Sequence, residues 1–183
     1  MSKPEGKTET PEQISLREVM EYYGYKGTIG KYRYYLRFFF SWLLQFLAQI
    51  SPHPGLTVVL QRMRGVKIGK HVFMGRNILI DDLYPQLVTI EDYTSIGTNT
   101  MIFVHAHAGY CMKLKLNYYP RVVKPVTIKT GAWVPPGCII LPGVTIAENS
   151  AVGAGSVVTH DTEPWTVSVG NPLKIVKRLE PKD

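Results

Sequence analysis

The stretch that decides the fold is residues 140–178, ILPGVTIAENSAVGAGSVVTHDTEPWTVSVGNPLKIVKR. A bulky aliphatic residue recurs there at every sixth position, at Ile140, Ile146, Val152 and Val158. An amphipathic helix would show a period of about 3.6 residues and a half-buried strand a period of about two. A period of six indicates a repeating unit of one short strand and one turn, with the aliphatic side chain pointing inward.

The same six-residue spacing continues upstream of this stretch. Its aliphatic positions there are Ile68, Met74, Ile80, Ile90, Ile96, Ile102, Ile128 and Val134. Most units carry a small or β-branched residue four positions later, where the wall would bend: Val72, Ile78, Thr94, Thr100, Ala132, Cys138, Val144, Ser150, Ser156 and Thr162. Three units close a triangular coil of about 18 residues, and stacked coils bury a continuous core. The pattern predicts a mainly β chain with a parallel β-helix over residues 65–166 and a tail over 167–183.

Two segments interrupt the spacing. Residues 81–88, DDLYPQLV, form a small bulge between units. Residues 105–125, HAHAGYCMKLKLNYYPRVVKP, form a long protruding loop. Because loops of that length in a compact domain are usually functional, the second segment is the expected location of chemistry.

A helical extension is expected before the β-helix, over residues 12–64. Residues 1–11 are rich in Lys, Glu, Thr and Pro and are expected to be disordered. A short helix is expected from about residue 11 to 23. The most apolar segment is 31–50, KYRYYLRFFFSWLLQFLAQI, which predicts a second helix. Its polar residues recur every four positions and form one narrow stripe: Arg33, Arg37, Ser41, Gln45 and Gln49.

Two interpretations of the 31–50 helix remain open at this stage. Arg37 and Gln45 interrupt the apolar run, so it makes a poor transmembrane span. One interpretation is a helix buried against the domain or against a neighbouring subunit. The other is a helix lying in a membrane surface, anchored by its aromatic and basic residues.

The composition is that of a soluble globular protein, with 45% hydrophobic and 19% charged residues among 183. The formal net charge of +7 is spread along the chain without a dense basic block, so no nucleic-acid partner is expected. The two cysteines show no disulfide or zinc spacing, and the N-terminus is polar. These features favour a cytoplasmic location, with membrane association through residues 31–50 left open.

The hexapeptide pattern resembles that of the left-handed β-helix acyltransferases. The segments PGVTI, VGAGSVVT and GNP bring the chain nearest to the sugar O-acetyltransferase branch, which includes galactoside, maltose and nodulation-type enzymes. The resemblance covers roughly residues 65–178. Left-handedness comes only from the resemblance, because ordinary parallel crossovers are right-handed. The resemblance implies a homotrimer with active sites between subunits, acetyl-CoA as co-substrate, and acetyl transfer to a hydroxyl of a sugar or polysaccharide-type acceptor.

In such enzymes a histidine of the extended loop is the general base, and the matching position here is His107 in FVHAHAG. Imidazole titrates near neutral pH and can remove the proton from an attacking hydroxyl. His105 is the alternative base, or it orients His107, or it simply packs. A His-x-His pair can also bind a metal, but the remaining histidines offer no third ligand at a recognised spacing. No metal site is therefore predicted.

The resemblance also implies binding residues. Asn77 and Asp82 match positions that face the acceptor hydroxyls, although both types are also common turn formers. The family asparagine often falls two residues earlier, where this chain has Gly75. The positions that match the CoA groove are Trp133, Pro136, Ala154, Gly155, Thr159, Lys174, Lys177 and Arg178. His160 stands where the family often has lysine.

Other functions compete with O-acetylation. The same fold could acylate an amine on an amino sugar, a nucleotide sugar or an amino acid. A γ-carbonic-anhydrase-like metalloenzyme would need three histidine ligands, and their spacing is not found. A non-catalytic structural module would need neither the late motifs nor a histidine-bearing loop.

Overall fold

The structure is a computed structural model, and it describes residues 9–181. The expectation of disorder over residues 1–11 falls almost entirely outside the described residues. The chain divides into two compact units. Within the described residues, one unit comprises residues 9–37 and 107–121, and the other comprises residues 38–106 and 122–181. The two units are described separately below.

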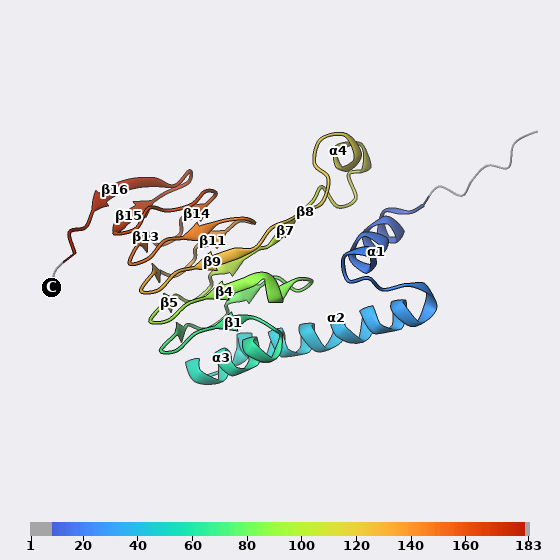
Figure 1. Cartoon of the computed structure of the whole chain (residues 1–183), viewed down its shortest axis with the longest axis horizontal. Coiled ribbons are helices and arrows are strands. Elements are labelled where there is room, and N and C mark those ends of the chain that lie inside the picture. The colour runs from blue at the N-terminus through green and yellow to red at the C-terminus, as the bar shows by residue number, and fades with distance from the viewer. Residues whose placement is uncertain (1–8, 182–183) are drawn as a thin grey trace, which may run out of the picture. The chain divides into compact units, whose positions relative to one another are not determined.

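The larger unit is a parallel β-helix with three faces, each a sheet of short strands (Figure 1). The first sheet contains β1 (Lys67–Ile68), β4 (Val88–Ile90), β9 (Val126–Ile128) and β12 (Thr145–Ile146). The second contains β2 (Phe73–Met74), β5 (Ser95–Ile96), β10 (Trp133–Val134), β13 (Ala151–Val152), β15 (Thr166–Val169) and β16 (Lys174–Arg178). The third contains β3 (Leu79–Ile80), β6 (Met101–Ile102), β11 (Ile139–Ile140) and β14 (Val157–Val158).

The strand register confirms the coil length that the sequence predicts. Ile140 pairs with Val158, 18 residues further along the chain. In the first coils Met74 pairs with Ile96, a separation of 22 residues that accommodates the bulge with η1 (Pro85–Leu87). The next separation, from Ile96 to Val134, is 38 residues because the long loop lies between these strands. Both interruptions therefore leave the phase of the stack unchanged.

The core consists of the predicted aliphatic positions. Eleven of the twelve are buried, and Ile68 in the first coil is half-buried. The residues four positions later are buried too, except for the half-buried Val72. Burial of each large aliphatic side chain contributes about 1.5–3 kcal/mol, so the repeated inward positions are the main stabilising term of the coils.

Each end of the stack is closed by a different element. α3 (Pro54–Met63) packs on β1 and β2 at the first coil, where Thr57, Val58 and Gln61 are buried. At the last coil β16 turns back antiparallel to β15. All five residues of β16 are exposed, and its basic side chains discourage further strands from adding to the edge.

The smaller unit contains α1 (Pro11–Tyr22) and α4 (Met112–Asn117), the latter within the long loop. Thr10 and Gln13 cap α1 reciprocally, which fixes its start one residue after Thr10. The loop leaves the β-helix through the antiparallel pair β7 (His105–Ala106) and β8 (Val122–Val123), which belongs to the larger unit.

The apolar helix is α2 (Gly27–Ile50), which begins four residues before the predicted start. Its C-terminal half belongs to the larger unit, where Ser41, Gln45 and Ala48 are buried. No helix among residues 9–181 is both long enough and apolar enough to cross a membrane.

Candidate active site

The stem of the long loop is fixed by the buried carboxylate of Asp81, which directly follows β3. Oδ2 of Asp81 lies 2.5 Å from Nδ1 of His105 and accepts the backbone N–H groups of Val104 and His105. Oδ1 accepts the backbone N–H groups of Leu83 and Tyr84 at 3.0 and 3.1 Å. One side chain therefore ties the bulge after β3 to the start of the loop.

The charge state of Asp81 follows from these contacts. Burial opposes ionisation of the carboxyl, but the hydrogen bond and charge of His105 and the backbone N–H groups outweigh it. The pKa of Asp81 is consequently lowered from its ordinary value. The carboxylate accepts the proton of Nδ1, so in the neutral ring of His105 the other nitrogen, Nε2, is unprotonated. A carboxylate that orients an imidazole in this way is a common arrangement for a general base.

His107 lies in the smaller unit and contacts α1. Its Nε2 is 3.4 Å from an Nη2 of Arg121 and 3.5 Å from the hydroxyl of Ser15. The same Nη2 donates to the Ser15 hydroxyl at 2.6 Å. Because an arginine N–H can only donate, Nε2 of His107 is the acceptor and carries no proton in this arrangement. A hydroxyl is thus held next to an unprotonated imidazole nitrogen.

Arg121 is itself fixed by Glu18 of α1. Oε2 of Glu18 accepts from Nε of Arg121 at 2.8 Å and from Nζ of Lys115 at 2.9 Å. Burial raises the pKa of Glu18, but the two cations more than offset this and the pKa is lowered. The Nη1 atom of Arg121 is buried and has no hydrogen-bond partner among the described residues. An unpaired buried donor costs about 1–3 kcal/mol, so this atom is suited to an oxygen of a bound molecule.

A second polar cluster surrounds Arg64, whose side chain is fully buried. Arg64 donates to the side chains of Gln45, Gln61 and Ser41 and to the carbonyls of residues 80 and 81. It also forms an ion pair with Asp82 at 3.2 Å. Burial lowers the pKa of Arg64 to about 10, with Asp82 and Asp81 acting in the opposite direction, so Arg64 is charged at neutral pH.

Two residues, Asn77 and Asp82, are predicted to face the acceptor substrate. Of these, Asp82 has a partly buried side chain that is paired with a charge. Its carboxylate is 39% exposed. Burial raises the pKa of Asp82, and the Arg64 cation reduces this effect. The sequence-based expectation that Asp82 faces an acceptor is not tested by these contacts, but they show that the carboxylate is held in place by a partner on another element.

Asn77 occupies a turn. Its backbone is in the left-handed region, with φ of 54°, and its side-chain amide donates to Asn99 of the next coil at 2.7 Å. Gly75, at the position of the family asparagine, has no room for a side chain. A Cβ there would lie 2.6 Å from the backbone nitrogen of Thr98. The close packing of the first two coils therefore requires glycine at position 75, where the family often has asparagine.

The residues predicted to bind CoA are all exposed on the larger unit. Pro136 and Gly155 lie in stacked turns, joined by a backbone hydrogen bond of 3.0 Å. A Cβ at Gly155 would meet no atom within 4 Å, so the space beside it is open. Trp133 on β10 and the three cations on β16 share one sheet, separated by β13 and β15. Arg178 is engaged by Glu163, whereas Thr159 follows β14 on another sheet. The role of the whole set stays a prediction.

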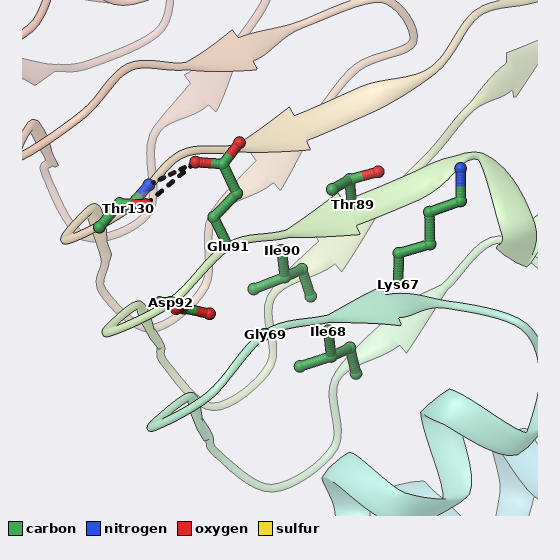
Figure 2. A pocket seen from close by; sticks show the side chains of 8 residues that line it. All are labelled: Lys67, Ile68, Gly69, Thr89, Ile90, Glu91, Asp92 and Thr130. Carbon is green, nitrogen blue, oxygen red and sulfur yellow. Dashed lines mark hydrogen bonds between the residues drawn. The ribbon is translucent and has the colours of Figure 1, made fainter.

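A pocket of about 520 Å³ lies over β1 and β4, away from these residues. Figure 2 shows Glu91 turned toward Thr130, with which it forms hydrogen bonds of 3.0 and 3.1 Å. Glu91 also pairs with Lys129, and Asp92 accepts a backbone N–H from Lys70. Glu91 and Asp92 therefore join neighbouring coils, and none of the predicted site residues lines this pocket. Within residues 9–181 no group of three His, Cys, Asp or Glu side chains is arranged to hold a metal ion.

These clusters contain residues that sequence reasoning missed: Ser15, Glu18, Gln61, Arg64, Lys115 and Arg121. Ser15 and Arg121 are 106 positions apart in the chain, and a contact over that distance cannot be predicted from a local motif. Asp81 was recognised only as part of the bulge. The adjacent acids Asp81 and Asp82, directly after β3, are the local sequence feature that lies nearest to these clusters.

A comparison with protein families identifies the late coils. Residues 125–160 match the family model described as bacterial transferase hexapeptide (six repeats). This segment carries the hexapeptide repeat. Among curated proteins, it is 34% identical over 118 residues to galactoside O-acetyltransferase of Escherichia coli, covering 64% of this chain and 56% of that protein. The chain thus spans just over half the length of the curated relatives that it matches.

Solved structures confirm the fold class. A hexapeptide-repeat acetyltransferase of Vibrio cholerae, complexed with acetyl-CoA, superposes with a TM-score of 0.66 at 24% identity and covers 80% of this chain and 88% of that one. A maltose O-acetyltransferase of Clostridium difficile gives a TM-score of 0.62 at 24% identity, covering 96% and 94%. The expected left-handed β-helix of hexapeptide repeats with N-terminal helices is therefore confirmed.

Proposed function

We propose that this protein is an acyltransferase that moves an acetyl group from acetyl-CoA to a hydroxyl of a sugar or polysaccharide-type acceptor. The observation that carries the proposal is the position of His107, an unprotonated imidazole nitrogen beside a hydroxyl, in the long loop of a hexapeptide β-helix. Two further findings support it. The curated relative from Escherichia coli is named as a galactoside O-acetyltransferase, and a structural neighbour was solved with acetyl-CoA.

In the proposed reaction Nε2 of His107 takes the proton of the acceptor hydroxyl as its oxygen attacks the thioester carbonyl. The tetrahedral intermediate then collapses, the carbon–sulfur bond breaks, and the imidazolium returns its proton to the departing CoA thiolate. No acyl-enzyme forms. The net change is one ester formed and one thioester broken, with no proton gained or lost by the enzyme.

Ser15 and Arg121 have defined roles in this proposal. The Ser15 hydroxyl lies 3.5 Å from Nε2, where an acceptor hydroxyl would have to lie for proton transfer. It therefore marks the acceptor position, and an acceptor displaces it. Without an acceptor Arg121 donates to Nε2, and this contact is released when Nε2 takes the proton of the acceptor hydroxyl; Glu18 holds Arg121 in place. The unpartnered Nη1 of Arg121 would donate a hydrogen bond to an oxygen of the bound acceptor.

Asp82 and Asn77 are proposed to face acceptor hydroxyls, with Arg64 fixing the carboxylate of Asp82. CoA is proposed to lie against Trp133, Pro136, Ala154, Gly155, Thr159, Lys174, Lys177 and Arg178, where small residues allow close approach to the backbone and cations meet phosphates. We further propose a homotrimer in which this groove of one subunit faces the loop of the next.

The chemistry of the product tests the assignment to a hydroxyl. The protein is incubated with acetyl-CoA and matched pairs of acceptors, such as a hexose and its amino-sugar counterpart, and the products are analysed by mass spectrometry. We expect acetylation of the hexose, with a product that mild alkali cleaves because it is an ester. An alkali-stable product formed only from the amino sugar would instead assign the enzyme as an N-acetyltransferase, the alternative that the fold also permits.

A further inference from the structure

The C-terminal half of α2, residues 38–50, belongs to the larger unit and turns polar side chains toward that unit's first coil. Within the larger unit Ser41 donates to the carbonyl of Asp82 at 3.1 Å, and Gln45 donates to the carbonyl of Ile78 at 2.8 Å. The carboxamide oxygen of Gln45 also contacts the buried Arg64. Ser41 and Gln45 thus contact the charged cluster around Arg64, and among the described residues of this unit the opposite face of the helix remains exposed.

That opposite face, here called the α2 apolar face, consists of Phe39, Phe40, Trp42, Phe46, Leu47 and Ile50. These six side chains are between 39% and 60% exposed. They recur at spacings of three and four residues, so they lie on one side of the helix. Trp42 and Phe46 stack with ring centroids 6.1 Å apart. A wide exposed patch of this kind on an otherwise compact fold marks an interaction surface.

The charge of residues 22–80 indicates which kind of partner fits the α2 apolar face. Residues 22–80 contain no Asp or Glu at all, although the whole chain has 14 of them. The same residues contain nine of the 21 Lys and Arg. One of these, Arg64, is buried and paired with Asp82, whereas Lys31 and Arg33 are exposed on α2 itself. An acid-free, cationic segment of 59 residues is complementary to an anionic surface.

We propose that the α2 apolar face docks into the headgroup region of an anionic lipid bilayer, with the helix lying parallel to the membrane. The aromatic side chains suit the boundary between headgroups and acyl chains, and the flanking cations suit anionic headgroups. The helix is not apolar enough to span a membrane, so the docking is peripheral. This proposal does not depend on the acyltransferase assignment.

A second copy of this chain fits the face less well. Two copies joined through α2 would bring the cations of both helices together, and no acid within residues 22–80 could pair with them. The apolar face is also wider than a coiled-coil seam. In a coiled coil whose seam ran through Phe39, Phe46 and Ile50, the flanking positions would usually carry charged pairs. Here the flanking positions are Phe40, Trp42 and Leu47.

Flotation of the full-length protein with lipid vesicles tests the proposal. Vesicles of phosphatidylcholine mixed with phosphatidylglycerol are compared with vesicles of phosphatidylcholine alone. We expect the protein to float with the anionic vesicles and to remain at the bottom with the neutral ones. Addition of salt should weaken the interaction, because the attraction between exposed charges is screened. Absence of flotation with anionic vesicles at low salt overturns the proposal.

Substitutions locate the contact. The triple variant Phe39→Ser, Phe46→Ser, Ile50→Ser should float at least ~10-fold less, since three large apolar side chains leave the docking face. The matched control Leu114→Ser, Leu116→Ser, Val176→Ser changes exposed apolar residues on other elements and should float like the wild type. Circular dichroism and light scattering check folding and mass. Equal flotation of the two variants contradicts the proposal. The proposal also fails if the wild type does not float and the α2 variant forms a smaller oligomer than the wild type, because the α2 apolar face would then be a subunit contact.

Charge reversal provides an independent arm that leaves the apolar side chains intact. Lys31→Glu, Arg33→Glu should reduce flotation on anionic vesicles, whereas Lys113→Glu, Lys124→Glu should not. Equal loss with both pairs would mean that only net charge matters, and would contradict docking through α2.

Discussion

Replacement of His107 by alanine lowers kcat for acetyl transfer by about 10²–10⁴-fold, the contribution of a positioned general base. The hydroxyl oxygen is a poor nucleophile while it keeps its proton. In the variant, the side chain of residues 9–181 that still has a hydrogen bond with the Ser15 hydroxyl is Arg121, which is a donor and cannot act as a base. The measurement is steady-state release of the CoA thiol with a saturating acceptor. Because His107 is only half-buried, the fold should survive the change, and thermal unfolding provides the check.

The matched control for this prediction is His105→Gln. His105 is anchored by Asp81, and its loss should alter stability more than the chemical step. The opposite result, with activity surviving in His107→Ala and abolished in a folded His105→Gln, would make the Asp81–His105 pair the base and its carboxylate partner. The geometry of that pair is competent for the role, so the comparison discriminates between two real candidates.

The substitution Asp81→Ala should lower the free energy of unfolding by about 3–5 kcal/mol, the cost of breaking a buried charged network. Four backbone N–H groups and the imidazole of His105 lose their acceptor at once. At roughly 2–4 °C per kcal/mol for a chain of this size, the melting temperature should fall by roughly 6–20 °C. The control Asp161→Ala removes an exposed aspartate that accepts one N–H, from Thr145, and should cost about 1 kcal/mol. Equal shifts in the two variants would contradict the role of Asp81 as the anchor of the loop stem.

The same carboxylate predicts a pH dependence. The pKa of Asp81 is lower in the folded protein than its ordinary value, so its ionised form is favoured by folding. Its contribution to stability is therefore complete above the unfolded-state pKa, near 4, and is lost as the pH falls through the folded-state value. The stability difference between wild type and Asp81→Asn, measured by denaturant unfolding, should shrink below about pH 4. A difference that grew in acid would contradict the assignment.

The stacked coils were predictable because their pattern is local and repeated. Each inward aliphatic is buried for the same reason in every unit, and the interruptions change the chain length between strands without changing the phase. The orientation of α2 was not predictable. Ser41 and Gln45 face inward because they contact the buried Arg64. The hydrophobic pattern of residues 31–50 gives no information about an arginine outside that segment.

In the candidate site, too, some features could be predicted from the sequence and others could not. The loop and both histidines were visible from the sequence, since they interrupt a regular repeat. Their partners were not, because Asp81 lies 24 residues before His105 and Ser15 lies 92 residues before His107. Such contacts depend on how distant elements meet. The Gly75 departure was visible as a mismatch, but its cause, the close approach of Thr98, belongs to the stacking of coils.

The most direct test of the acyltransferase assignment is CoA release from acetyl-CoA by the wild-type protein, measured with and without a panel of sugars, oligosaccharides and amino sugars. We expect release to depend on the acceptor, and calorimetry to show acetyl-CoA binding even without one. Acceptor-dependent release with a hydroxyl-only sugar would establish the reaction class. A folded protein that neither binds acetyl-CoA nor releases CoA with any acceptor would contradict it, and the β-helix would then serve another purpose.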